Sequence, residues 1–287
     1  MGLRKLLVPM VGAADEVPAL STALAVAKTV GAHVEALFMA IDPELEIVSG
    51  DYISPAVINQ ITKETAKENE KRRRRTRALF GRLTHKYGVP TDLSPTKNGL
   101  SAAYVEVTGS AHSLMAHHGR LCDLIVIEPG AEHGSEMALG IEAALRDSGR
   151  PVLVTRRPEP AGFAKCIGVA WNGSLEATRT IGFAMTLLER AEKVVILTVE
   201  DDGRYGPPAM ELKEYLAWHG ISAVAISLPP PPPPHGQGDA LIVAAKEHGI
   251  DLMMLGAYTR GELRRLIFGG VTGTMLAESP VPLLMMH

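Results

Sequence analysis

The chain has 287 residues, which is enough for about two domains of ordinary size. Hydrophobic residues make up 46% of it and aromatic residues only 5%, so aliphatic side chains and methionine must form most of the core. A formal net charge of −3 gives the chain no overall attraction to nucleic acid or an anionic membrane. No apolar stretch has the length of a membrane span, and the N-terminus is too short for a signal peptide. We therefore expect a cytoplasmic protein with neither a membrane nor a nucleic acid as its partner.

Apolar runs alternate with helical patterns along the first half of the chain. Short apolar runs indicate buried strands, and apolar residues at intervals of three and four indicate helices. The predicted strands are Leu3–Met10, His33–Ile41, Thr91–Thr96, Cys122–Ile127 and Pro151–Arg156. The predicted helices are Pro18–Val30, Pro55–Tyr87, Ala102–His118 and Met137–Asp147. A proline-rich segment at 157–162 then predicts a linker.

The second half shows the same alternation. Its predicted strands are Cys166–Trp171, Val194–Val199, Ala223–Leu228, Asp251–Leu255 and Val281–Met286. Its predicted helices are Leu175–Arg190, Pro208–His219, Asp239–Glu247 and a last helical stretch that ends at Glu278. Strands that alternate with helices predict a parallel sheet with both faces covered.

The two halves also repeat one another in sequence. Three pairs of segments align in the same order: Leu6–Pro9 with Ile167–Ala170, Gly119–Ile127 with His248–Leu255, and Ser148–Thr155 with Ser279–Met286. The repeated unit is too long for a solenoid. We therefore predict two similar domains, residues 1–157 and 163–287.

A glycine-rich segment follows the apolar run at 251–255. Gly256 ends that run, a basic turn follows, and Gly269 and Gly270 stand before Val271-Thr-Gly-Thr274. Glycine lets backbone amides approach an anion, and the N-terminus of a helix favours negative charge. The segment predicts a phosphate cradle, and a tight turn without a ligand is the alternative.

The spacing of these glycines resembles the nucleotide motif of the universal stress protein family, G-x2-G-x9-G-[ST]. Gly256 and Gly269 match its first and third glycines, whereas Thr259 and Gly270 depart from the second and fourth positions. The family includes tandem two-domain proteins, and the repeated chain looks like one. The resemblance implies an α/β fold of two doubly wound, parallel, five-stranded sheets, similar to the adenine nucleotide alpha hydrolase fold, with strand order 3-2-1-4-5.

That order implies a ligand crevice beyond the carboxyl ends of the first and fourth strands. In the second domain Asn172 takes the place of the family's aspartate, Val199 would lie under the adenine, and Arg260 would contact a phosphate. The full set implied to hold ATP or ADP, with or without Mg²⁺, is Trp171, Asn172, Gly173, Val199, Gly256, Tyr258, Thr259, Arg260, Gly269, Gly270, Val271 and Thr272. An alternative for Asn172 is a purely structural role in a turn between strand and helix.

The resemblance implies a stress-response protein that binds an adenine nucleotide and signals to an unidentified protein partner. No catalytic triad, pair of carboxylates or metal cluster is evident, and Asp201 and Asp202 are the only acids near the crevice. We therefore expect no more than weak ATPase activity. A slow nucleotide hydrolase and a nucleotide-free interaction scaffold remain alternatives.

The first domain lacks the cradle, because Ala138 and Leu139 stand where the second domain has its paired glycines. We expect a degenerate site there. The resemblance also implies that the fifth strands, Val152–Thr155 and Leu283–Met285, meet across a pseudo-two-fold axis as an intramolecular pseudo-dimer, with a homodimer as an open alternative. The basic run Lys71–Arg77 indicates either an exposed helix with i,i+4 ion pairs, which we favour, or a patch for an anionic partner.

Overall fold

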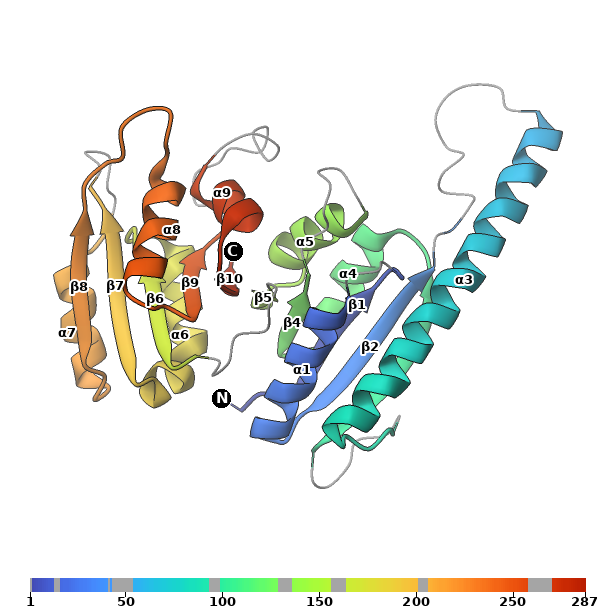
Figure 1. The fold of residues 1–287 in the computed structure, drawn as a ribbon, viewed down its shortest axis with the longest axis horizontal. Coiled ribbons are helices and arrows are strands. Elements are labelled where there is room, and N and C mark those ends of the chain that lie inside the picture. The colour runs from blue at the N-terminus through green and yellow to red at the C-terminus, as the bar shows by residue number, and fades with distance from the viewer. Residues whose placement is uncertain are drawn as a thin grey trace. The chain divides into compact units, whose positions relative to one another are not determined.

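The computed structural model describes residues 2–12, 16–40, 42, 54–92, 99–128, 136–155, 164–200, 206–257 and 270–287. The chain divides into two compact units, a first unit Gly2–Arg150 and a second unit Pro151–His287 (Figure 1). None of the described helices is long and apolar enough to cross a membrane.

The first unit is a parallel sheet flanked by helices. Its elements are β1 Lys5–Met10, α1 Val17–Val30, β2 His33–Ala40, α3 Pro55–Tyr87, β3 Ser101–Thr108, α4 Ala111–Gly119, β4 Leu124–Ile127 and α5 Glu136–Asp147. The strands lie in the order β3-β2-β1-β4, and the pairings of β1 with β2, of β1 with β4 and of β2 with β3 are parallel. The inner strands β1 and β4 are almost wholly buried, as strands covered on both faces must be.

The second unit repeats this plan. Its elements are β5 Val152–Val154, β6 Cys166–Ala170, α6 Leu175–Arg190, β7 Lys193–Val199, α7 Ala209–Trp218, β8 Ala223–Leu228, α8 Gln237–Glu247, β9 Leu252–Gly256, α9 Val271–Glu278 and β10 Leu283–Met286. Its strands lie in the order β5-β10-β9-β6-β7-β8. Counted along the chain from β6, the strands have the predicted order 3-2-1-4-5, so the fold class is confirmed.

The strand β5 pairs with β10 and is antiparallel to it. Leu153 lies opposite Leu284, and Val152 lies opposite Met285. The predicted meeting of the two fifth strands is therefore confirmed as a strand pairing. The division into compact units includes β5 in the second unit, whereas the sequence predicts a first domain of residues 1–157.

The prediction of one helix over Ala102–His118 is wrong. Residues 101–108 form β3, which pairs with β2 from His33↔Ser101 to Ala40↔Thr108. Alanines at 102 and 103 favour a helix locally, but the long pairing with β2 overrides that preference. Ser110 then caps a separate helix α4, its hydroxyl accepting from the Ser113 amide at 3.2 Å. Thr91 of the predicted strand Thr91–Thr96 forms only an isolated bridge with Ala102, and residues 93–96 lie outside the described residues.

Two aspartates show that the sequence repeat is also a structural repeat. Asp123 precedes β4, and its Oδ2 accepts hydrogen bonds from the backbone amides of Arg4 and Lys5 at 2.8 and 2.9 Å. Asp251 precedes β9, and its Oδ2 accepts from the amides of Lys165 and Cys166 at 3.0 and 3.2 Å. Each carboxylate thus fixes the start of the first strand of its unit against the fourth.

Candidate functional site

The turn after β6 forms one wall of the predicted nucleotide crevice. Gly173 has a φ of 75°, a left-handed conformation that glycine adopts without strain. The Asn172 side chain accepts a hydrogen bond from the Ser174 amide at 3.1 Å, and the Ser174 hydroxyl caps α6 by accepting from the Ala177 amide at 3.2 Å. The sequence Asn-Gly-Ser therefore makes a self-supporting turn, and the Asn172 side chain bonds within that turn.

Trp171 positions this turn through its buried side chain. The residue is only 5% exposed, and its Nε1 donates to the Pro207 carbonyl at 2.8 Å. Its own carbonyl accepts from the Thr198 hydroxyl at 3.3 Å. Because the residue is almost fully buried, Trp171 offers a ligand little surface.

Gly256, the last residue of β9, is required by packing. A Cβ at this position would lie 2.6 Å from the Ala177 nitrogen and 2.9 Å from the Glu176 Cβ. The glycine thus lets the end of β9 approach the first turn of α6. This role exists whether or not a ligand binds, so Gly256 alone is weak support for a cradle.

Gly270 stands at the start of α9 and has a different environment. Its φ is 122°, and a Cβ built on it would meet no atom of the described residues within 4 Å. The Thr274 amide donates to the Gly270 carbonyl at 3.1 Å, and no side chain from the described residues caps the helix. Val271 and Thr272, the next two residues, are half-buried. Among the described residues, none packs against the Cβ position of Gly270 at the start of α9.

The strand register brings several predicted residues to one edge of the sheet. Ala170 pairs with Leu255 and with Leu197, so the turn after β6, the end of β9 and Val199 at the end of β7 share the carboxyl edge. Four residues of the predicted site and the two nearby acids lie outside the described residues: Tyr258, Thr259, Arg260, Gly269, Asp201 and Asp202.

His287 is a neighbour of the crevice that the sequence patterns did not indicate. Its Nδ1 lies 2.9 Å from the Ala257 carbonyl, and the Ala257 amide donates to the Met286 carbonyl at 2.8 Å. These contacts hold the residue that follows Gly256 against the end of β10. The signal available in the sequence was the position of His287 directly after a strand that neighbours β9.

In the first unit, the equivalent turn is occupied by the carboxylate of a side chain of that unit. Glu16 is 4% exposed, and its Oε1 accepts from the backbone amides of Val11 and Gly12, the latter at 2.7 Å. These amides would otherwise be available to an anionic ligand. The arrangement supports the expectation that the first unit does not hold a nucleotide in the same manner.

The basic run on α3 is engaged in ion pairs. Glu68 pairs with Lys71 at 3.3 Å and with Arg72 at 3.7 Å, while Glu70 pairs with Arg73 and Arg74. These are the i,i+3 and i,i+4 contacts of an exposed helix. They favour the structural interpretation of the run over a dedicated patch.

Comparison with known proteins agrees with this fold. Residues 235–287 match the model of the universal stress protein family, and no curated protein matches the sequence. A universal stress protein from Archaeoglobus fulgidus DSM 4304 is similar in structure, with a TM-score of 0.68 and 16% identity over 98% of this chain and 97% of that one. A functionally unknown protein from Pseudomonas aeruginosa PAO1 has a TM-score of 0.56 and 16% identity over 99% of this chain and 92% of its own.

The structural likeness, at such low identity, shows a shared fold, and the family match within the second unit adds a sequence relationship. The sequence relationship to the universal stress protein family therefore covers residues 235–287.

Proposed function

We propose that the second unit binds an adenine nucleotide, ATP or ADP, at the carboxyl edge of β6 and β9, and that the protein acts in stress-response signalling. The observation that carries the proposal is the start of α9. There Gly270 has a conformation suited to glycine, a Cβ on it would contact none of the described residues, and no side chain from these residues caps the helix. Such a helix end favours a phosphate because its amides and its dipole both attract negative charge.

Two other features fit a nucleotide. The turn Asn172–Ser174 brings backbone and a left-handed glycine to the same sheet edge, where a ribose could lie. Val199 is half-buried at the end of β7 and offers an apolar surface to a base. Ligands of open α/β sheets bind at this edge, where the strand order reverses between the first and fourth strands.

The proposal is for binding rather than turnover. Asn172, whose amide cannot accept a proton as a base, already bonds within its own turn. We therefore expect bound ATP to survive for hours, at a rate far below the roughly 10 per second typical of enzymes. Hydrolysis at ordinary enzyme rates that Asp201→Ala or Asp202→Ala abolishes would show instead that the protein is a nucleotide hydrolase.

Thr272→Asp tests the site while sparing the fold. A carboxylate in the first turn of α9 improves helix stability through the helix dipole, but it repels a phosphate in the same place. By calorimetry with ATP and Mg²⁺ we expect micromolar affinity for the wild type, roughly −8 kcal/mol, and at least about tenfold weaker binding for the variant. Thr272→Asn is the matched control, because asparagine has nearly the shape of aspartate but carries no charge. This variant should bind ATP like the wild type.

Gly269→Asp is a second variant, at a position outside the described residues, and should abolish binding. Equal ATP affinity in Thr272→Asp, Thr272→Asn and the wild type would show that α9 does not hold the phosphates. Mass spectrometry of the ligand released from freshly purified protein identifies the nucleotide independently of these variants.

A further inference from the structure

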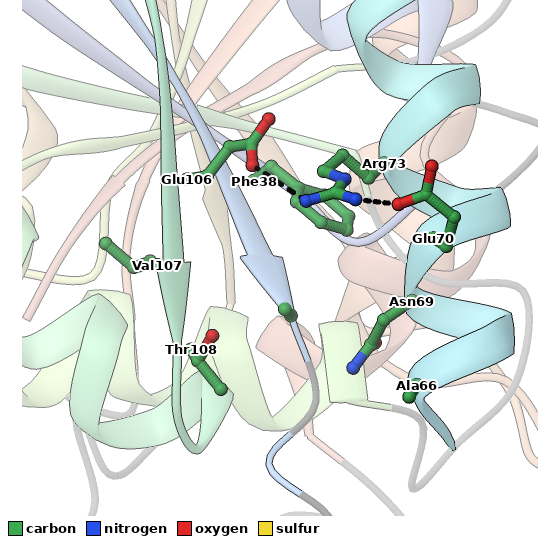
Figure 2. A pocket seen from close by; sticks show the side chains of 9 residues that line it. Phe38, Ala66, Asn69, Glu70, Arg73, Glu106, Val107 and Thr108 are labelled. Carbon is green, nitrogen blue, oxygen red and sulfur yellow. Dashed lines mark ion pairs between the residues drawn. The ribbon is translucent and has the colours of Figure 1, made fainter. Parts of the chain in front are cut away.

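The first unit contains a pocket of about 400 Å³ where β2 and β3 end beneath α3 (Figure 2). Part of its wall is apolar, formed by Phe38, Ala40 and Ala66. The rest is charged, with Arg73 lying between Glu70 and Glu106. The volume is in the range of small-molecule sites in proteins, about 300–1,000 Å³.

The length of α3 creates this pocket. The helix has 33 residues and spans about 50 Å, whereas an eight-residue strand spans about 27 Å. Its buried residues begin only at Thr76, and the turns before that point extend past the ends of the strands (Figure 1). The overhanging turns, with Ala66 and Arg73, make one wall, and the ends of β2 and β3 make the other. The pocket thus lies at the carboxyl edge of a parallel sheet, where such folds bind ligands.

Arg73 can turn toward a ligand at little electrostatic cost. Its Nη1 lies 3.6 Å from Glu106 Oε2, and it also pairs with Glu70. Each carboxylate has a second arginine, since Glu70 also pairs with Arg74 at 2.5 Å and Glu106 also pairs with Arg77 at 3.7 Å. If Arg73 contacted another anion, neither carboxylate would lose its last positive partner.

The charge around the pocket favours a negatively charged ligand. Between Lys63 and Arg77 the helix carries eight basic residues and three acidic ones. Glu106 is one further acid from the opposite wall. The excess of positive charge attracts an anion and repels an amine.

We propose that this pocket binds a small organic anion. The apolar body of the ligand lies against Phe38, Ala40 and Ala66, and its carboxylate or phosphate group is bound by the Arg73 guanidinium, whose planar donors match such a group. This site is separate from the nucleotide site in the second unit and does not depend on it.

The test uses three probes of the same shape and different charge: phenylbutyrate, phenylbutanol and phenylbutylamine. Ligand-observed NMR with the full-length protein measures the binding of each. The expected order is the acid first, the alcohol much weaker, and the amine weakest. Arg73→Gln should weaken the binding of phenylbutyrate by about tenfold, the size of a lost charged hydrogen bond. Arg82→Gln, which removes an exposed arginine of the same helix that does not line the pocket, should leave it unchanged.

A second pair of variants tests the location. Ala66→Trp fills the pocket from an exposed helix position and should abolish binding of phenylbutyrate, whereas Ala78→Trp, at an exposed position that does not line the pocket, should not. Circular dichroism checks that all four variants keep their helices, and Thr272→Asp should bind phenylbutyrate normally. The proposal is overturned if the wild type binds no phenylbutyrate, if the amine binds more tightly than the acid, or if Arg73→Gln and Ala66→Trp both bind like the wild type.

Discussion

The turn after the first strand has the same backbone in both units and very different surroundings. Gly12 has a φ of 81° and Gly173 a φ of 75°, and the sequence repeat places them at equivalent positions. In the second unit a small residue faces this turn, because a Cβ on Gly206 would lie only 2.2 Å from the Gly173 carbonyl oxygen. In the first unit a long helix faces it.

The helix that follows the second strand makes the difference. In the second unit α7 has 10 residues and begins only at Ala209. In the first unit α3 has 33 residues and passes Gly12 so closely that a Cβ there would lie 2.4 Å from the Arg72 Cβ. Arg75 also donates to the Gly12 carbonyl at 2.8 Å. The same turn can therefore border a ligand site or a packed interface, depending on the element that covers it.

The largest loss of stability is expected when the edge strand β5 is removed from the second unit. A fragment of residues 163–287, the domain predicted from sequence, lacks β5 and leaves β10 as an uncovered edge. The fragment 151–287 keeps the buried side chains of Val152, Leu153 and Val154. Loss of these three should lower the free energy of unfolding by roughly 5 kcal/mol.

Urea unfolding of the two fragments measures this difference in stability. Equal unfolding midpoints would show that β5 contributes nothing to the stability of the second unit.

A smaller effect is expected from Gly12→Ala. The added methyl group meets the Arg72 Cβ and Cα, and the left-handed backbone adds strain, so we expect a loss of about 3 kcal/mol. Gly88→Ala is the matched control, because Gly88 has a φ of 64° at the end of α3 but a Cβ there would meet none of the described residues within 4 Å. Its cost should be about 1 kcal/mol, from the backbone alone. Urea unfolding of both variants checks the difference, and equal costs would mean that α3 yields easily at Gly12.

Local signals account for what the sequence predicted well. The predicted bounds Pro55–Tyr87 agree with those of α3, since Ser54 caps its start, proline occupies the first turn and Gly88 ends it in a left-handed conformation. Such caps can be identified in a sequence. β3 was missed because its alanines suit a helix, and only its pairing with β2 decides otherwise.

The parts that were not predicted depend on contacts between distant segments. Gly12 and Arg72 are sixty positions apart in the sequence, and no local pattern indicates that they meet. The first-unit pocket was invisible for the same reason, because Glu106 had been assigned to a helix and its partner Arg73 to a solvated run. In the second unit the paired strands and the turn at Asn172 follow the prediction, whereas much of the glycine segment lies outside the described residues.

The smallest expected effect is on the local opening of each unit, and the two cysteines, one in each unit, report it. Both are free thiols. Burial raises the pKa of Cys122 to about 12, and its Sγ donates to the Gly119 carbonyl at 3.2 Å. Cys166 is half-buried at the start of β6, and burial raises its pKa as well. A thiol must ionise and be accessible to react, so at pH 8 a maleimide should label Cys166 slowly and native Cys122 hardly at all.

Because each cysteine belongs to one unit, its labelling follows the opening of that unit. Gly12→Ala destabilises the first unit, so it should speed the labelling of Cys122 and leave that of Cys166 unchanged, as peptide mass spectrometry over time can measure. Gly88→Ala should speed the labelling of Cys122 less, because it lowers the free energy of unfolding by a smaller amount. Equal acceleration at both cysteines would show that the two units open together. In that case the contrast between their first turns would describe local packing and not two separately stable halves.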